Sequence, residues 1–238
     1  MALQFEIHHA QTEILRTLLF TEHATFSELC KRTGFSSDHF NFHIKKLLEA
    51  NLVEKTKDKT YRLTHGGKEY ANQLDTDDRT IEKQPKTGVL LIVERKRDDG
   101  QNEYIFQERL KQPFYGFFLF PTGKVRWGET FEYTAERELK EETNLEGTFK
   151  LIGITRKRDY SKEDNKLLED KVFYNMLCSD AHGELMTEFE GGRNYWLTHD
   201  EFIAKGKSIL DARIEFKHLN LPELTYYQEE YFHSKQDY

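Results

Sequence analysis

Acidic side chains are concentrated in one short stretch of this 238-residue chain, between Gly123 and Leu145. They stand at fixed distances from a glycine and an arginine, in the order Gly123, Glu129, Arg137, Glu138, Glu141 and Glu142. Carboxylates four residues apart on one helical face repel each other, and burying either alone is costly. A divalent cation removes both penalties, and oxygen ligands suit Mg2+ or Mn2+. The spacing therefore predicts a metal site that binds the oxygens of a diphosphate and activates water.

A helix must hold these carboxylates, and its flanking residues predict where it begins and ends. Thr130 is of a residue type that caps helix N-termini. The apolar stripe of such a helix consists of Phe131, Ala135 and Leu139. Glu138 and Glu142 fall within about 60° of the centre of that stripe, whereas a merely solvated helix keeps its carboxylates on the opposite side. At the far end Asn144 is of a residue type that can end a helix in the left-handed conformation, second only to glycine.

The order G-x5-E-x7-R-E-L-x-E-E resembles the Nudix box of the MutT/Nudix hydrolase superfamily. The resemblance implies an α/β chain with an α/β/α sandwich around a mixed sheet, and Mg2+ as cofactor, with Mn2+ as an alternative. It implies that Glu138, Glu141 and Glu142 bind metal and that Glu138 and Glu142 act in catalysis. It also implies that Gly123, Glu129 and Arg137 hold the geometry of the loop and helix, Glu129 and Arg137 as an ion pair. Thr122 and Asn144 stand where glycine is common in the family.

Two further site residues are suggested outside this box. MutT-like proteins carry a glutamate followed by glycine, six residues before a tryptophan, and Glu190, Gly191 and Trp196 repeat that spacing. Glu190 is therefore a candidate catalytic residue, as a further metal ligand or as the general base, with Glu188 or neither as alternatives. Arg109, which precedes the box, is a candidate for binding a substrate phosphate.

The remaining pattern of residues 87–238 alternates strands and helices. Short apolar runs rich in branched residues predict strands at 87–94, 104–110, 148–155, 171–177 and 195–197. A polar loop is expected at 159–170. Thr198 with Glu201 predicts the start of a helix over 200–205. A terminal helix is predicted at 221–232.

Residues 1–75 form a smaller, mostly helical unit. Amphipathic spacing predicts helices at 5–20, after Thr25, and from Ser36 or Ser37 to Ala50, followed by a hairpin over 52–64 and a helix over 68–74. This order resembles a winged helix-turn-helix domain of the ArsR/MarR kind. The resemblance implies a recognition helix at 37–46, with Ser37, His39, Asn41, His43, Lys45 and Lys46 as its polar residues. The wing would carry Lys55, Lys57, Lys59 and Arg62 beside DNA phosphates.

Other interpretations of the N-terminal unit stay open. The same residues would also suit a solvated helical bundle or a dimerisation module, so a homodimer is an alternative to DNA binding. His39 and His43, four residues apart, are spaced to chelate a transition metal, as in a metal-sensing repressor. No cysteine or second histidine pair is placed to complete a tetrahedral site, which favours the plainer interpretation.

Composition limits the remaining possibilities. The length suggests two domains, joined by a polar linker at 76–86. The two cysteines, Cys30 and Cys178, are far apart and are expected to be reduced. No membrane span or signal peptide is recognisable, so a cytoplasmic location is expected. Residues 1–75 hold 10 Lys and Arg against 10 Asp and Glu, so the remainder carries the whole net charge of −7. An acidic domain favours a small metal-bound phosphate substrate over a long nucleic acid.

Two functional hypotheses follow. The first is a Mg2+-dependent hydrolase that cleaves the diphosphate linkage of a nucleoside diphosphate derivative and is fused to a DNA-binding domain. The second is a transcriptional regulator whose Nudix-like domain senses a nucleotide metabolite. Retention of the complete set of acidic residues favours the enzyme, because a sensor has no need of all three glutamates.

Overall fold

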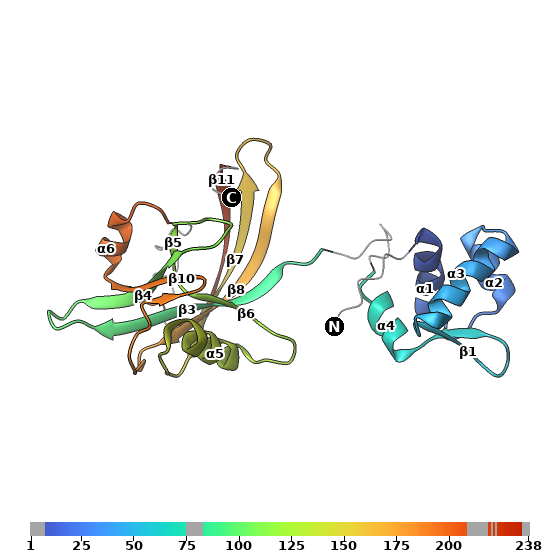
Figure 1. The fold of residues 1–238 in the computed structure, drawn as a ribbon, viewed down its shortest axis with the longest axis horizontal. Helices are drawn as coiled ribbons and strands as arrows, with labels where there is room; N and C mark the ends of the chain where they lie inside the picture. Colours follow the sequence, from blue (N-terminus) through green and yellow to red (C-terminus); the bar gives the residue numbers. More distant parts are fainter. Residues whose placement is uncertain (1–7, 75–82, 209–218, 220, 222, 235–238) are drawn as a thin grey trace. The chain divides into compact units, whose positions relative to one another are not determined.

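A computed structural model describes residues 8–74, 83–208, 219, 221 and 223–234. The chain divides into two compact units, Met1–Lys83 and Gln84–Tyr238 (Figure 1). The sequence predicted a linker at 76–86. Residues 75–82 lie outside the described part of the chain, and the first strand of the second unit begins at Lys86. None of the described helices is long and apolar enough to cross a membrane.

The N-terminal unit has the predicted order of elements. Its helices and strands are α1 His9–Leu19, α2 Phe26–Thr33, α3 Ser37–Glu49, β1 Val53–Lys55, β2 Tyr61–Leu63 and α4 His65–Ala71. Local residues set several of the boundaries. Thr25 and Glu28 form a reciprocal capping box at the start of α2, and Gly34 ends it with φ 70°. Ser36 caps α3 through the backbone N–H of His39.

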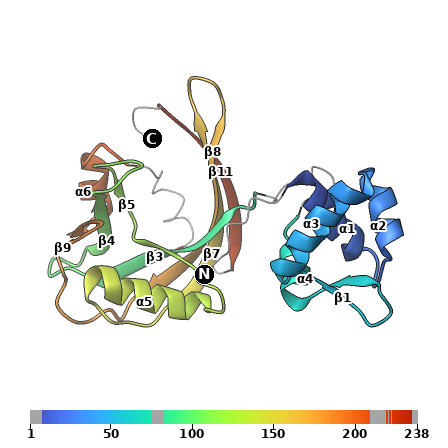
Figure 2. The ribbon, with the colours of Figure 1, turned by 45° about the vertical axis from the view of Figure 1, so that its right-hand side comes forward.

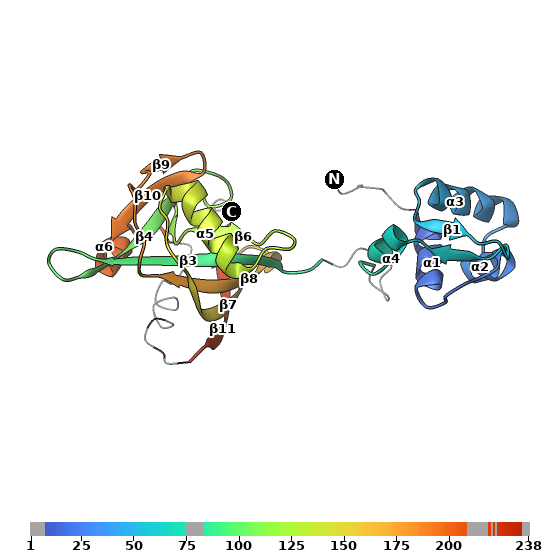
Figure 3. The ribbon, with the colours of Figure 1, turned by 90° about the horizontal axis from the view of Figure 1, so that it is seen from below.

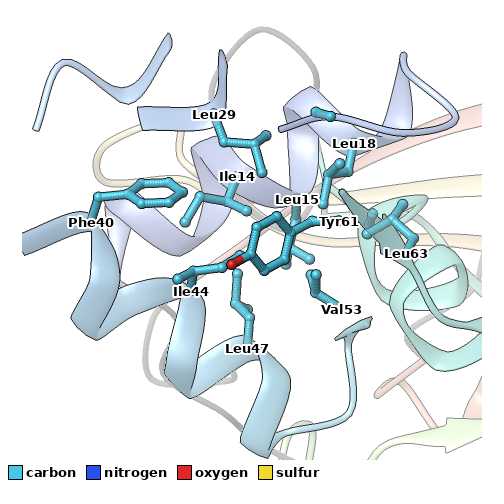
Figure 4. Close-up of a cluster of buried hydrophobic side chains, with 12 residues drawn as sticks. Ile14, Leu15, Leu18, Leu29, Phe40, Ile44, Leu47, Val53, Tyr61 and Leu63 are labelled. Atoms are coloured by element: carbon cyan, nitrogen blue, oxygen red, sulfur yellow. The ribbon is translucent and has the colours of Figure 1, made fainter. Parts of the chain in front are cut away.

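One apolar core holds these elements together (Figure 4). It contains side chains from every one of the three longer helices and from both strands: Ile14, Leu15, Leu18, Leu29, Phe40, Ile44, Leu47, Val53, Tyr61 and Leu63. Ala24, which precedes α2, pairs with Tyr61 and extends the β1–β2 hairpin by one bridge. The hairpin is therefore attached to the helices by side-chain packing and by backbone hydrogen bonds.

Helix α4 begins earlier than predicted. It starts at His65, so both glycines lie inside the helix and Thr64 caps it through the N–H of Gly67. A Cβ at Gly67 would lie 1.8 Å from the carbonyl oxygen of Leu52. Glycine is present because two backbone segments touch, and not because the helix has yet to begin.

The C-terminal unit is built on a mixed nine-stranded sheet in the order β11-β7-β8-β3-β4-β10-β9, with β5 paired to β4 and β6 to β3. Strand β3 pairs parallel with β8 and β7 pairs parallel with β11, whereas the other pairs are antiparallel. The strands are β3 Lys86–Lys96, β4 Asn102–Arg109, β5 Phe118–Leu119, β6 Thr122–Lys124, β7 Lys150–Ser161, β8 Leu167–Cys178, β9 Glu188–Phe189, β10 Gly192–Leu197 and β11 Thr225–His233.

Helices α5 (Phe131–Thr143) and α6 (His199–Ala204) cover the two faces of this sheet. The alternating residues of β3 divide between two cores, Leu90 and Ile92 with Phe202 of α6, and Val89, Leu91 and Val93 with Ala135 and Leu139 of α5. Seen from below, α5 lies across β3 and β8 (Figure 3). Strands β7, β8 and β11 form the curved part of the sheet beside it (Figure 2). The predicted α/β class with a mixed sheet is confirmed.

Two predictions about this unit were wrong. Residues 225–233 form strand β11 and not a terminal helix. The extent of burial alternates along these residues, as expected of a strand, and they pair parallel with β7 from Thr225 to His233. The polar segment 159–170 is mostly paired strand as well, because β7 continues to Ser161 and β8 begins at Leu167. Cross-strand ion pairs replace the apolar contacts expected of a strand there.

Candidate functional site

A pocket of 660 Å³ opens between α5, β3, β6, β8 and the loop that joins β4 to β5. Glu138 and Glu142 line one side of it. The opposite wall is formed by alternate residues of β8, and the loop between β4 and β5 supplies basic and aromatic residues. Polar and apolar groups therefore line a cavity large enough to hold a nucleotide.

Close contact between helix and strand explains the glycine at position 123. The side chain of Glu138 lies so near to Gly123 of β6 that an added Cβ would be 2.1 Å from the Glu138 Cγ. Any larger residue would push the carboxylate out of place. Gly123 therefore determines where the Glu138 carboxylate lies within the pocket.

Glu142 is a largely buried carboxylate that no cation among the described residues contacts by a hydrogen bond. Its Oε2 accepts a hydrogen bond of 2.9 Å from the amide of Gln107, and Asn194 donates to its backbone carbonyl. Burial raises the pKa of Glu142, and the neighbouring Glu138 raises it further, against the opposing effects of Gln107, Lys111 and Arg109. The protein thus places an acid where its ionised form is poorly compensated by the surrounding side chains.

Glu129 is compensated fully. Arg137 donates from Nε and Nη2 to its two oxygens at 3.0 Å, and Thr134 and the N–H of Arg126 donate as well. These bonds, led by that from Arg137, lower the pKa of Glu129 to about 2. The predicted ion pair between Glu129 and Arg137 is present, and it fastens the loop before α5 to the helix.

Arg137 also reaches two of the predicted metal ligands. Its Nη1 lies 2.8 Å from Glu138 Oε1 and 3.0 Å from Glu141 Oε2. Its side chain is only 9% exposed, while that of Glu141 is half exposed and does not line the pocket. The structure therefore brings Glu138 and Glu142 together and keeps Glu141 on the rim.

The donor set fits a hard divalent cation. Glu138 and Glu142 supply carboxylate oxygens in one pocket, and the nearby charges of Lys111 and Arg109 do not offset the rise in the pKa of Glu142 that burial causes. No group of three or more His, Cys, Asp or Glu side chains among the described residues is arranged as a finished metal site. In this structure Arg137 forms ion pairs with both Glu138 and Glu141, so its guanidinium balances these two carboxylates.

Two basic residues near the pocket differ in what they contact. The guanidinium of Arg109 donates to the carbonyl oxygens of Pro113 and Gln112, and so supports the loop after β4. Lys111 also lines the pocket, near enough to lower the pKa of Glu142, and among the described residues its ammonium has no hydrogen-bond or ion-pair partner. The sequence suggested Arg109 for the substrate phosphate and missed Lys111.

The structure does not bring Glu190 to the pocket. It is exposed in the tight turn between β9 and β10, and Glu188 is paired with Arg193 on the same hairpin. Neither lines the cavity. The residues that do support Glu142 from this side, Gln107 and Asn194, were not singled out by sequence. Their signal was weak, since each is a lone amide within an alternating strand.

Most of the predicted DNA-contacting residues are exposed on α3 and the β1–β2 hairpin, namely Ser37, His39, Asn41, Lys45, Lys46, Lys55, Lys57, Lys59 and Arg62. His43 is an exception, because it is 4% exposed and stacks against His8. Two of the cations are paired within the unit, Lys46 with Glu49 and Arg62 with Glu54. The prediction that His43 contacts DNA is therefore wrong, because its ring packs into the protein.

His39 and His43 do meet, with their Nε2 atoms 3.1 Å apart. Burial and the two neighbouring histidines lower the pKa of His43. No third metal-ligating side chain completes a site around them in the described part of the chain. The pair is accounted for as a hydrogen bond between the two rings.

Comparison with known proteins places the chain in a family. Residues 83–216, more than half of the chain, match the NUDIX domain. The chain therefore belongs to the Nudix family, and the resemblance drawn from the spacing of the acidic residues is confirmed. Residues 3–74 match a domain described only as a domain of unknown function, DUF7347.

Individual relatives agree with this assignment. An ADP-ribose pyrophosphatase of Methanocaldococcus jannaschii is 33% identical over 101 residues, which are 40% of this chain and 57% of that protein. The chain thus matches little more than half the length of this relative. The MutT protein of Bacillus halodurans superposes with a TM-score of 0.50 at 20% identity, covering 64% of this chain and 93% of the other. The second likeness is one of fold.

Proposed function

We propose that the unit from Gln84 to Tyr238 is a pyrophosphohydrolase that cleaves the diphosphate linkage of a nucleoside diphosphate derivative with the help of Mg2+ or Mn2+. The observation that carries the proposal is the uncompensated carboxylate of Glu142, which shares a pocket with Glu138 and faces Lys111. A metal-bound diphosphate would match both kinds of charge in this pocket. Its metal ion would balance the two carboxylates, and its phosphate oxygens would pair with Lys111. The relative named an ADP-ribose pyrophosphatase supports the same class of reaction.

Each side chain has a distinct part in this proposal. Glu138 and Glu142 would hold the ion, joined by Glu141 once it leaves Arg137. When bound, the ion neutralises phosphate oxygens and makes a bound water more acidic. Lys111, which lies near Glu142, binds a substrate phosphate, and Arg109 supports the loop that carries Lys111. A contact between Arg109 and a substrate phosphate stays a prediction. A role for Glu190 as ligand or general base stays a prediction.

The test is a substrate panel with the full chain. ADP-ribose, dinucleoside polyphosphates and nucleoside triphosphates are incubated with Mg2+, with Mn2+ and with EDTA, and the products are separated by chromatography. We expect turnover of at least one substrate with metal and none with EDTA. Glu142→Gln should lower kcat by about 100-fold or more, the scale of losing one charged contact to the reacting centre.

A matched control keeps this result interpretable. Glu136 lies on the same helix with an exposed side chain and does not line the pocket. Glu136→Gln makes the same chemical change and should retain full activity. Failure of the wild-type protein to hydrolyse any member of the panel with either metal would exclude the hydrolase.

We further propose that the N-terminal unit is a winged helix domain that binds DNA through α3 and the β1–β2 hairpin. The order of three helices, hairpin and helix supports this, together with exposed Lys45 on α3 and exposed Lys57 on the hairpin. A regulator that senses a nucleotide remains the alternative for the whole chain, and dimerisation the alternative for this unit. The paired state of Lys46 and Arg62 lowers the positive charge left for phosphates.

Gel shifts at several salt concentrations test DNA binding. Lys45→Ala and Lys57→Ala should each weaken the shift and reduce its salt dependence, because each phosphate contact releases a counterion. Lys68→Ala on α4, outside both elements, is the control and should have no effect. If all three variants bind equally, the unit does not use this surface for DNA, and light scattering then tests the dimer.

A further inference from the structure

The wall of the pocket opposite α5 consists of alternate residues of one strand. Glu169, Lys171 and Phe173 of β8 all line the cavity, as residues two apart on a strand must share a face. Lys86 of β3, which pairs with Lys171 in register, lines it beside them. Arg109 lines the same pocket, and the charges of both Glu169 and Glu142 act on it.

An ion-pair chain holds this wall. The Glu169 carboxylate accepts a hydrogen bond of 2.6 Å from Lys86 and also pairs with Lys171. Lys171 contacts Asp159 of β7 at 3.2 Å, and Asp159 contacts His233 Nε2 of β11 at 2.8 Å. Strand β11 follows the matched Nudix region, which ends at residue 216. This arrangement therefore includes an element that the family match does not cover.

The ion pairs of Glu169 and Lys171 leave both side chains able to form further hydrogen bonds with a ligand. Asp159 is 3% exposed and Glu169 is 10% exposed, so both carboxylates are held in a fixed place by cations. Each carboxylate has about four lone-pair sites, and the described contacts of Glu169 use two. Glu169 can therefore accept hydrogen bonds from hydroxyl groups, and Lys171, with three N–H groups, can donate one.

Charge decides what kind of group suits the wall. Lys86 and Lys171 balance Glu169 and Asp159, so the wall as a whole carries no excess positive charge. A further phosphate would meet buried carboxylates that repel it. A neutral group with several hydroxyls would find acceptors and donors already oriented, and the ring face of Phe173 beside them.

We propose that Glu169 and Lys171, positioned by Asp159 and His233, form a subsite for a neutral, hydroxyl-bearing group attached to the far phosphate of the diphosphate. The preferred substrate is then a nucleoside diphosphate joined to a sugar, rather than a nucleoside triphosphate or a dinucleoside polyphosphate. This inference rests on the proposed function for the location of the diphosphate.

The test compares two ligands that differ only in that group. ADP-ribose carries the sugar, and the β-methyl ester of ADP keeps the diphosphate ester and lacks it. Both kcat/KM and, by calorimetry, Kd are measured on the full chain. We expect the wild-type protein to favour ADP-ribose over the methyl ester by about tenfold or more in kcat/KM and in Kd, which is the scale of a hydrogen bond to a charged group. Glu169→Gln should lose most of this ratio between the two ligands.

A neighbouring residue supplies the control. Asp170 pairs with Arg156 at 2.7 Å and does not line the pocket, so Asp170→Asn removes an ion pair of β8 from the other face. It should leave the ratio unchanged. If Glu169→Gln also leaves the ratio unchanged, the subsite is refuted while the hydrolase stands. A preference in Kd without any turnover refutes the hydrolase and supports the subsite, and binding of neither ligand refutes both.

His233 is a positioning residue, and its role is tested by rescue. His233→Phe keeps a ring to pack on Phe114, 4.7 Å away between centroids, and removes the partner of Asp159. It should lower the ratio in the same direction as Glu169→Gln. His233→Gln restores a hydrogen-bonding group and should recover most of it. A His233→Phe variant that folds, by its melting temperature, and keeps the full ratio would show that β11 has no part in the subsite.

Discussion

Glu129 and Glu142 stand at the two ends of the same helix and their environments are opposite. Glu129 receives four hydrogen bonds, two of them from Arg137, and its pKa falls to about 2. Glu142 is buried beside another carboxylate with one side-chain amide as its partner, and its pKa rises. The first acid is satisfied by the protein and maintains the structure. Among the described residues no cation donates a hydrogen bond to the second acid, and the proposed function assigns a metal ion to it.

The largest expected effect is on the response to metal. Mg2+ at about 100 times its Kd should stabilise the wild-type protein by about 2.7 kcal/mol, because it binds only the folded chain. Glu142→Gln should lose most of this gain, and without metal it should be no less stable than the wild type, since a costly buried charge is gone. Thermal melts in Mg2+ and in EDTA measure both. If Mg2+ stabilised the wild type and Glu142→Gln equally, Glu142 would not differ from Glu129 in binding a metal ion.

Glu129→Gln should behave in the opposite way. It leaves the Arg137 guanidinium, in a side chain that is 9% exposed, without its bidentate partner, so the melting temperature should fall with or without metal. Activity should fall as well, because Arg137 would no longer be fixed by Glu129 and would position Glu138 and Glu141 less accurately. A variant with an unchanged melting temperature would show that the ion pair does not stabilise the loop and helix.

The same pair predicts a smaller effect of pH. The folded pKa of Glu129, about 2, lies below its ordinary value of 4.5, so its contribution to stability is complete above pH 4.5 and disappears as the pH falls toward 2. The difference in unfolding free energy between wild type and Glu129→Gln should therefore shrink over that range. Urea titrations at pH 6, 4 and 3 would follow the difference. A constant difference would contradict the assigned cause of the shift.

Sequence patterns predicted this helix well because its determinants are local. The structure begins α5 after Thr130, which accepts a hydrogen bond from the N–H of Tyr133, and ends it at Asn144. The box spacing also anticipated the contact between Arg137 of the helix and Glu129, which lies eight residues earlier in the loop before it. Such relations need only the geometry of one helix and its preceding loop.

Predictions failed where distant segments meet. Strand β11 is specified by pairing with β7, more than sixty residues earlier, and the segment itself does not reveal that pairing. Lys111 and the wall of Glu169 and Lys171 come together only when β4 and β8 join the same pocket. Arg109 does line the pocket, but its contacts with carbonyl oxygens in the next loop could not be read from the sequence, and its binding of a phosphate stays a prediction. No local pattern carries this information.

The smallest predicted effect concerns the end of the helix that the two acids share. Asn144 has φ 61° and ψ 5°, the left-handed conformation that was predicted, and its side-chain amide donates to the Glu184 carbonyl. Asn144→Ala should cost about 1 kcal/mol, because a Cβ without a compensating hydrogen bond disfavours this conformation. Asn144→Gly gains backbone freedom and loses the amide contact, so it should stay within about 0.5 kcal/mol of the wild type. Urea denaturation of both variants measures the difference, and activity should not change in either. If the alanine variant were as stable as the glycine variant, backbone conformation would not be what selects the residue at this position.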